Sequence, residues 1–249
     1  MRSINSLFRR LGFEIHRADD SRRDFHSYHY LRHNSRRLEH LASLRIPVAN
    51  LTVLEVGAGI GDHSHYYLDR NCTVTITEAR RQNLSILKQR YPGCDVQFLD
   101  MEAPVAPEGA PFDVVHCYGL LYHLSAPLKA MEFLAQCTKQ MLFLETCVSF
   151  GSGEDIFNVA EMKSSPTQAV SGTGCRPTRA LLYRHLSTLF EYVYVPTTQP
   201  NHEEFPLDWT VRSPDGGGLL TRAVFVASRT ELGIDGLVRE LLEHQTRHP

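Results

Sequence analysis

The stretch "TVLEVGAGIGDHSHYY" at residues 52–67 constrains the fold more than any other, because an apolar strand runs into three alternating glycines and then into a helical segment. A strand that enters a glycine-rich turn at the start of a helix leaves backbone amides facing an anion or a nucleotide. Tight strand-to-helix turns also use glycine for steric reasons alone. The turn therefore predicts a binding corner only if the rest of the chain supports it.

Strands and helices alternate along the rest of the chain at regular spacing. Apolar and β-branched runs predict seven strands, at 51–56, 72–78, 95–100, 112–119, 140–148, 191–196 and 221–229. Helical patterns lie between and after them, at 62–70, 80–93, 126–139, 177–190 and 236–247. This alternation predicts an α/β fold with a Rossmann-like, mostly parallel sheet of seven strands and helices on both faces.

The 249 residues fit one large domain of this kind, and we expect a single domain over residues 1–249. Residues 1–46 form an expected helical arm, with a short amphipathic helix at 1–20 and a second helix at 24–44. Two irregular stretches interrupt the later alternation, at 149–176 and 196–221. Long structureless segments inside a compact domain are usually functional or disordered, so we interpret both as lid-like insertions.

Composition excludes several classes of protein. A net charge of −2, with 42% hydrophobic residues, argues against a general binder of nucleic acids or membranes. Residues 1–45 carry ten arginines against five acidic residues, a pattern most typical of a solvated helical face. No C-x-x-C pair and no apolar segment of signal-peptide or membrane-spanning length occurs. We expect a reduced, cytoplasmic protein, and the oligomeric state stays open.

The spacing of the glycines distinguishes between cofactors. A dinucleotide fingerprint would need its third glycine at position 62, where the chain has Asp62. An acidic residue at the start of the helix would also repel a pyrophosphate. The pattern Glu55-x-Gly57-x-Gly59-x-Gly61 therefore favours a cofactor without phosphates.

Two further acidic residues lie where a nucleoside would need them. Glu78 ends the second predicted strand, 21 residues after Gly57, at the position whose carboxylate accepts ribose hydroxyls in this architecture. Asp100 ends the third strand beside Met101, where its carboxylate is placed to accept from an adenine amino group.

The segments "VLEVGAGIGDHS", "ITEA", "FLDME" and "FDVVHCYGLLYHLSAP" together resemble the successive motifs of class I S-adenosylmethionine-dependent methyltransferases. The resemblance covers residues 50–147, and the part from 112 on is similar to small-molecule O-methyltransferases and to carboxymethyltransferases of the tRNA wobble uridine. It implies S-adenosylmethionine as cofactor and a last strand that is antiparallel.

The resemblance also assigns roles to individual residues. It implies that the three glycines wrap the amino-acid end of the cofactor, that the first acid orients its amino group, and that the later acids hold the ribose and the adenine. The implied cofactor-binding residues are Glu55, Gly57, Gly59, Gly61, Glu78, Asp100, Met101, Tyr118 and Gly119, the last two beneath the sulfonium carbon. Arg36 or Arg37 is a candidate for the cofactor carboxylate, although a helix-surface role is favoured for both.

Methyl transfer to a hydroxyl requires a base, and His123 in "LLYHL" is the leading candidate. Packing of His123 against the cofactor is the alternative, and the sequence leaves both open. His116 lies within a strand and is expected to be a buried, hydrogen-bonded histidine. His63 and His65 are two positions apart on a helix and cannot share a face, so no metal is expected there.

The two insertions hold the remaining polar residues. Arg176 and Arg179 lie near a predicted helix start and are candidates to bind a carboxylate or phosphate. His202 and Trp209 share the second insertion with three acidic residues, which suits a sugar or a polar ring, or only a loop packed by its tryptophan. Divalent-ion binding by these acids gains no support from their spacing, and no metal is predicted.

The function that these observations predict is methyl transfer to a hydroxyl or carboxyl of a small molecule or saccharide. A tRNA-modifying (carboxy)methyltransferase is the first alternative, but it would need a basic RNA surface that this slightly acidic chain lacks, and nucleic acid is not an expected partner. A non-catalytic relative that only binds the cofactor is the second, and the intact glycines and acids argue against it.

Overall fold

The computed structural model describes residues 21–211 and 220–249. The helix predicted at 1–20 and the part of the second insertion at 212–219 lie outside the described residues. Among the described residues, no helix combines the length and apolar character needed to cross a membrane.

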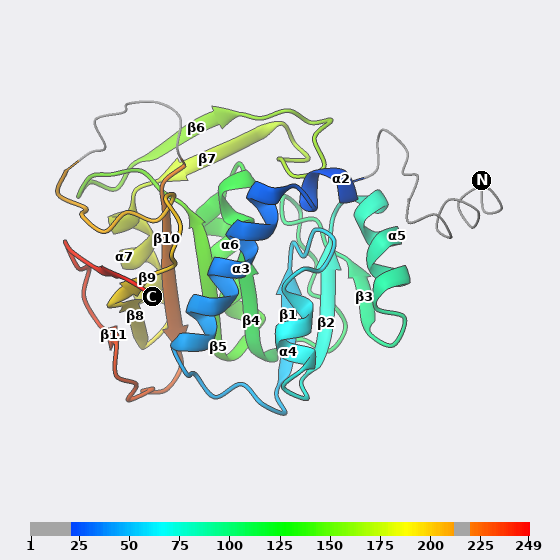
Figure 1. The fold of residues 1–249 in the computed structure, drawn as a ribbon, viewed down its shortest axis with the longest axis horizontal. Helices are drawn as coiled ribbons and strands as arrows, with labels where there is room; N and C mark the ends of the chain where they lie inside the picture. Colours follow the sequence, from blue (N-terminus) through cyan, green and yellow to red (C-terminus); the bar gives the residue numbers. More distant parts are fainter. Residues whose placement is uncertain (1–20, 212–219) are drawn as a thin grey trace.

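A central sheet of eight strands organises the molecule, in the order β11-β8-β10-β5-β4-β1-β2-β3 (Figure 1). Strands β1, β2, β3, β4, β5 and β8 are parallel to one another, and β10 runs antiparallel between β5 and β8. The seven main strands are β1 (Thr52–Val56), β2 (Thr73–Glu78), β3 (Asp95–Phe98), β4 (Phe112–Tyr118), β5 (Thr138–Cys147), β8 (Tyr192–Pro196) and β10 (Arg222–Ser228). The predicted Rossmann-like fold and its antiparallel last strand are confirmed, with a two-residue eighth strand added at the edge.

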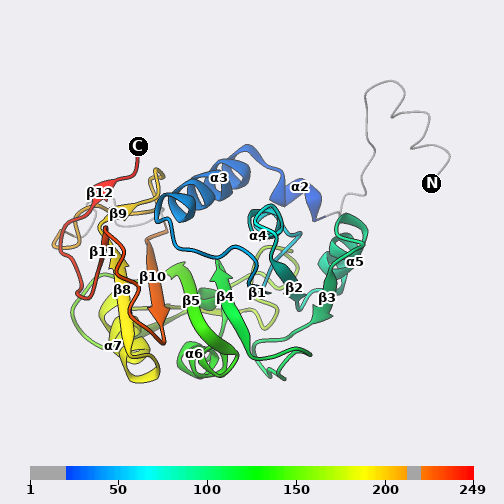
Figure 2. The ribbon, with the colours of Figure 1, turned by 90° about the horizontal axis from the view of Figure 1, so that it is seen from below.

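Helices cover both faces of this sheet, as Figure 2 shows. One face carries α3 (Tyr28–Ser43), α4 (Ser64–Leu68) and α5 (Arg81–Arg90), and the short helix α2 (Arg22–Phe25) precedes them. The other face carries α6 (Pro127–Gln136) and α7 (Arg179–Leu189). A 3-10 turn, η1 (Leu121–His123), follows β4 directly.

Two apolar cores result from the alternation of side chains along each strand. On β1, Val53 packs toward α3 and α4, whereas Leu54 packs toward α6 and α7. Both side chains are fully buried, and a buried aliphatic side chain stabilises the fold by about 1.5–3 kcal/mol. Because the cores hold the sheet on both faces, the carboxyl ends of β1, β2 and β4 form a rigid edge.

The helix predicted at 236–247 is wrong. The structure has β11 (Leu237–Val238), which pairs with the edge strand β8, and then turns that lead to β12 (Thr246–Arg247). Gln245, a buried residue within this stretch, donates a hydrogen bond from Nε2 to the Pro196 carbonyl. The open edge of β8 offers backbone partners that a local helix would leave unused, so sheet pairing overrides helix propensity here.

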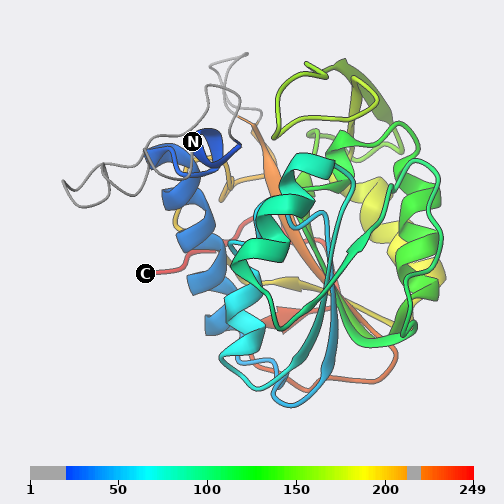
Figure 3. The ribbon, with the colours of Figure 1, turned by 90° about the vertical axis from the view of Figure 1, so that its right-hand side faces the viewer.

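The first insertion is also more ordered than its composition indicates. Its ends form an antiparallel hairpin of β6 (Ile156–Ala160) and β7 (Thr173–Pro177), which lies across the carboxyl ends of the sheet (Figure 3). The expectation of a stretch without regular structure is therefore wrong for these strands. In the second insertion, β9 (Thr198–Gln199) pairs with β12.

Candidate active site

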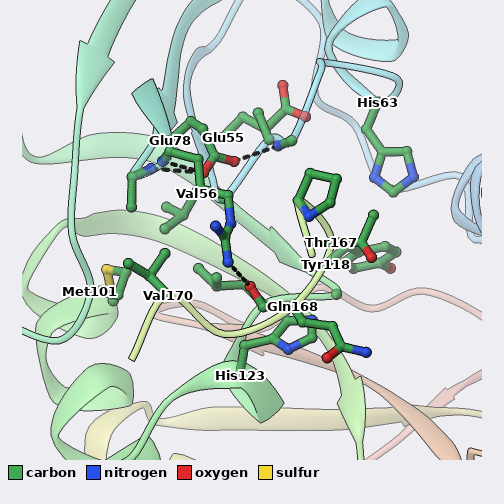
Figure 4. Close-up of a pocket in the computed structure, with 18 of the residues that line it drawn as sticks. Glu55, Val56, His63, Glu78, Met101, Tyr118, His123, Thr167, Gln168 and Val170 are labelled. Carbon is green, nitrogen blue, oxygen red and sulfur yellow. Dashed lines mark hydrogen bonds between the residues drawn. The ribbon is translucent and has the colours of Figure 1, made fainter. Parts of the chain in front are cut away.

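A pocket of about 940 Å3 opens at the carboxyl ends of β1, β2 and β4 (Figure 4). Eight of the nine predicted cofactor-binding residues line it, namely Glu55, Gly57, Gly59, Glu78, Asp100, Met101, Tyr118 and Gly119. Gly61 lies at the end of the same turn but not in the lining. Figure 4 shows Glu55 and Glu78 on one side of the pocket and His123 on the other.

The glycine turn adopts a backbone that other residues would disturb. Gly57, Gly59 and Gly61 all have positive φ angles, of 69°, 59° and 83°. A Cβ on Gly57 would lie 2.8 Å from the Leu120 side chain, closer than real Cβ contacts. The turn thus brings backbone to the pocket wall at a point where a side chain would not fit.

Glu55 is buried at the end of β1, where its carboxylate accepts a hydrogen bond from Ser64 Oγ at 2.5 Å. Desolvation by burial raises the pKa of the Glu55 carboxyl to about 7, although the Ser64 hydrogen bond acts in the opposite direction. A buried carboxylate in this state gains from any cation that enters the pocket beside it.

Glu78 fixes the glycine turn to the second strand. Its Oε2 accepts from the Gly59 amide at 2.8 Å, and its Oε1 accepts from the amides of Ala79 and Arg80 at 2.9 and 2.8 Å. Burial raises the pKa of Glu78, and these three amides lower it. Two carboxylate oxygens offer about four acceptor positions, so at least one remains for a ligand in the pocket.

Asp100 and Met101 form the wall beyond β3. Asp100 Oδ1 accepts a hydrogen bond from the Glu102 amide at 3.0 Å. Met101 is buried beside it. A carboxylate next to an apolar, polarizable side chain suits an amino-substituted ring.

Arg37 lies in the pocket wall, contrary to the helix-surface role that the sequence favoured for it. Arg37 is a buried residue of α3, and its Nη2 forms an ion pair with Glu145 Oε2 at 2.6 Å. Its Nε has no hydrogen-bond partner among the described residues. Arg36 does lie on the surface, where it pairs with Glu39.

The ion pair continues into a buried network that sequence reasoning missed. Glu145 also accepts from Arg222 Nη1 at 3.1 Å, and Arg222 Nε donates to Glu204 Oε2 at 2.5 Å. Arg222 Nη2 reaches the Tyr122 hydroxyl at 3.3 Å. These residues come from α3, β5, β10, η1 and the turn after β9, and no short-range motif links them.

Tyr118 ends β4, Gly119 follows it, and both lie beside Arg37. A Cβ on Gly119, which has a φ of 79°, would lie 3.0 Å from Arg37 Nη2. The Tyr118 hydroxyl is buried without a partner among the described residues. An unpartnered buried hydroxyl at a pocket wall is a group that a ligand can satisfy.

His116 is a buried histidine with hydrogen bonds at both nitrogens, as predicted. It contacts His63 Nδ1 at 3.1 Å and the Tyr67 hydroxyl at 2.9 Å, and burial lowers the pKa of His116 to about 3. His63 is buried beside His116, whereas His65 is exposed, so His63 and His65 do not share a face of α4.

His123 ends the 3-10 turn after β4 and lines the pocket. Its Nδ1 lies 2.5 Å from Glu161 Oε2, a residue of the first insertion. Desolvation lowers the pKa of His123, and the hydrogen bond and charge of Glu161 oppose this shift. Glu161 is fixed in turn by the Ala169 amide at 2.7 Å. Nothing in the sequence pointed to Glu161, because it lies 38 residues from its partner.

The segment between β6 and β7 covers the pocket. Residues 166–170 contribute to its lining, and Thr167, Gln168 and Val170 are labelled in Figure 4. Arg80 holds this segment by donating to the carbonyls of Lys163 and Gln168 at 3.1 and 2.7 Å. The first insertion therefore contacts both Arg80, which follows β2, and His123 on the other side of the pocket.

The four predicted substrate-binding residues do not come together. Arg176 Nη1 lies 3.8 Å from Oε1 of Glu161, the residue that contacts His123. Arg179 stacks over Trp209 at 4.2 Å, and both line a second cavity of about 1080 Å3. His202 is buried in a separate cluster of histidines and glutamates.

Comparison with known proteins agrees with this geometry. Residues 53–141 match the methyltransferase domain family. No curated protein gives a significant match.

Three solved structures illustrate the likeness in fold. The N-terminal domain of EvdMO1, determined with SAH and D-fucose, is 20% identical with a TM-score of 0.58, over 78% of this chain and 82% of that one. An S-adenosylmethionine-dependent methyltransferase from Mesorhizobium loti is 14% identical with a TM-score of 0.53, over 77% and 100%. The 1,6-didemethyltoxoflavin-N1-methyltransferase of Burkholderia thailandensis is 21% identical with a TM-score of 0.51, over 85% and 84%.

Proposed function

We propose that this chain, a class I S-adenosylmethionine-dependent methyltransferase by its domain family and its fold, methylates a hydroxyl group of a small molecule or saccharide. The observation that carries the proposal is the contact between His123 and Glu161 at the edge of the pocket. A carboxyl acceptor is the alternative, because it would need orientation but no base.

The pocket residues fit the cofactor. In this proposal Glu55 binds the amino group, Glu78 the ribose hydroxyls and Asp100 with Met101 the adenine. The buried Glu55 carboxylate suits an ammonium group, and Arg37, with its unpartnered Nε, suits the carboxylate of the same amino-acid end. Tyr118, whose hydroxyl has no partner among the described residues, and Gly119 line the same pocket as His123.

His123 is placed to remove the proton of the acceptor. S-adenosylmethionine supplies an electrophilic methyl group on a sulfonium. Glu161 accepts the Nδ1 proton of His123, which leaves Nε2 with the lone pair that can take a proton from a hydroxyl. The lowered pKa of His123 keeps the imidazole neutral at physiological pH, the state in which it acts as a base.

The segment over the pocket supports water exclusion. The 161–172 connection lies across the opening and is held through Arg80 and Glu161. Excluding water keeps the electrophilic methyl donor from reacting with water instead of the acceptor. The saccharide part of the proposal rests on the likeness in fold to the EvdMO1 domain, whose structure contains D-fucose.

Cofactor binding can be tested separately from the acceptor. We expect S-adenosylhomocysteine to bind the purified chain in calorimetry, and Glu78→Ala to weaken binding by about 1.5–3 kcal/mol, the value of a hydrogen bond to a charged group. Glu132→Ala, an exposed acidic residue of α6, is the matched control. Equal affinity in Glu78→Ala and the control would remove the cofactor assignment.

The acceptor class is tested by incubating the enzyme with methyl-labelled cofactor and a panel of sugars, phenols and carboxylic acids. We expect label only in hydroxyl compounds, at a rate that falls at acidic pH. Transfer to carboxylic acids with a flat profile above about pH 5 would replace the proposal by the carboxyl alternative.

A further inference from the structure

Three histidines and two glutamates gather outside the pocket, on the far side of Arg222. His29 and His33 lie one turn apart on α3, so they point to the same side of that helix. His202, Glu203 and Glu204 come from the turn after β9. Ligand atoms of His33, His202 and Glu204 lie within 4.8 Å of one another, and all three residues are buried. A second such group joins His29 to His202 and Glu203.

The buried members have hydrogen-bonding atoms that nothing satisfies. His33 Nε2 and His202 Nε2 are buried without a hydrogen-bond partner among the described residues. The two residues are only 3% and 1% exposed. An unsatisfied buried polar atom costs about 1–3 kcal/mol, so a pair of them facing one cluster points to a ligand that is bound there.

The spacing matches tetrahedral zinc. Zinc bonds to imidazole nitrogen and carboxylate oxygen are about 2.0–2.2 Å long, which sets neighbouring ligand atoms about 3.3–3.6 Å apart. His29 Nε2 lies 3.5 Å from Glu204 Oε1, and His33 Nε2 lies 3.7 Å from Glu204 Oε2. These separations are too long for hydrogen bonds and close to those that a shared ion requires.

The cluster is held rigidly from both sides. Arg247 donates to the carbonyls of Pro200, His202 and Phe205 at 2.7, 2.8 and 2.9 Å, which fixes the turn. Arg222 Nε donates a hydrogen bond to Glu204 and thereby orients its carboxylate. Because a guanidinium only donates hydrogen bonds, Arg222 acts as an outer partner of the ligand and does not bind the ion itself. Preformed ligands of this kind lower the cost of binding an ion.

The charged side chains around the cluster are paired with one another. The buried arginines Arg37 and Arg222 face the buried glutamates Glu145 and Glu204, so these four groups sum to zero. Glu203, 3.7 Å from His202 Nε2, pairs with Arg32 at 2.7 Å, so this second pair also sums to zero.

We propose that His33, His202 and Glu204 bind a zinc ion, with His29 as the fourth ligand on the open side. The Glu204 amide now donates to His202 Nδ1 at 3.3 Å, so binding through Nε2 moves the imidazole proton to Nδ1 and releases that long hydrogen bond. The ion pins α3 to the turn after β9. It thereby fixes Glu204 and, through Arg222, the buried network beside the pocket.

Titration of the metal-stripped full chain with zinc sulfate in calorimetry tests the site. We expect one equivalent to bind with micromolar or tighter affinity. His33→Ala and His202→Ala should each weaken binding by at least about tenfold, as even the loss of an outer-shell partner does. His65→Ala, an exposed histidine of α4, should bind zinc like the wild type.

Thermal unfolding provides a second measurement that needs neither cofactor nor acceptor. At 100-fold excess over its dissociation constant, zinc should raise the Tm of the wild type by about 5–10 °C and leave His33→Ala and His202→Ala nearly unchanged. Glu204→Gln, which keeps an acceptor for Arg222, serves if an alanine variant does not fold. Absent or millimolar binding to the wild type, or unchanged binding in all three variants, would overturn the site.

Discussion

The two sides of the pocket are built in different ways. On the cofactor side, the groups expected to bind come from consecutive strand ends, with Glu55 near the end of β1, Glu78 at the end of β2 and Asp100 just after β3. On the other side, which the proposal assigns to the acceptor, His123 depends on a partner from a distant segment, Glu161 of the first insertion.

The two sides therefore depend on different parts of the structure. Residues at the carboxyl ends of parallel strands meet at one edge whenever the sheet forms, so the cofactor side needs only the fold. The acceptor side also needs the first insertion to lie over the pocket, since this insertion brings Glu161 to His123. Variants on the acceptor side should therefore lose turnover, whereas variants on the cofactor side should lose cofactor affinity.

The largest expected effect comes from the acceptor side. His123→Ala should lower kcat by roughly 10²–10⁴-fold with little change in affinity for S-adenosylhomocysteine, since a positioned base acts only on the reaction. The rate of the wild type should fall as the pH drops through the lowered pKa of His123, because the protonated imidazole cannot accept a proton. A pH-independent rate together with weakened cofactor binding in His123→Ala would show that this side chain only packs.

Glu161 sharpens the same comparison as a positioning residue. Its carboxylate raises the pKa of His123, so Glu161→Gln should shift the acidic fall of the rate to lower pH and reduce kcat by at least about tenfold. Glu154→Gln, an exposed glutamate of the same insertion, should change neither. A reduced kcat without a shifted profile would assign Glu161 a structural role only.

On the cofactor side, Glu55 should show the cost of a buried acid. Its pKa is raised from 4.5 to about 7, so its contribution to stability is greatest below pH 4.5 and is lost as the pH rises to 7. Glu55→Gln should therefore stabilise the free protein at pH 8 by up to about 3 kcal/mol and weaken S-adenosylhomocysteine binding. Denaturant unfolding and calorimetry measure the two effects, and a variant that is less stable at pH 8 would contradict this account.

The smallest expected effect concerns Arg80, which joins the two sides. Arg80→Ala removes two hydrogen bonds to the first insertion, and we expect faster amide exchange across 161–172 and a few-fold weaker cofactor binding. In the wild type, exchange in this segment should slow when S-adenosylhomocysteine is added. The neighbouring exposed Arg81→Ala is the control, and protection that is already complete without ligand would argue against a lid.

The sequence by itself determined the sheet and the cofactor side. Hydrophobic periodicity located all seven main strands, and the glycine spacing with Glu55, Glu78 and Asp100 located one wall of the pocket. Both signals are local, because a strand buries alternate side chains and a turn needs its glycines within a few residues. The family resemblance then supplied the cofactor.

Only the tertiary structure decided the rest. The C-terminal segment pairs with the open edge of β8 instead of forming a helix, and the hairpin of the first insertion brings Glu161 to His123. Arg37 lies in the pocket although its helix pattern suited a surface, and His33 meets His202 across 169 residues of chain. Such contacts depend on how distant elements pack, and the pattern within any one element carries no record of its partner.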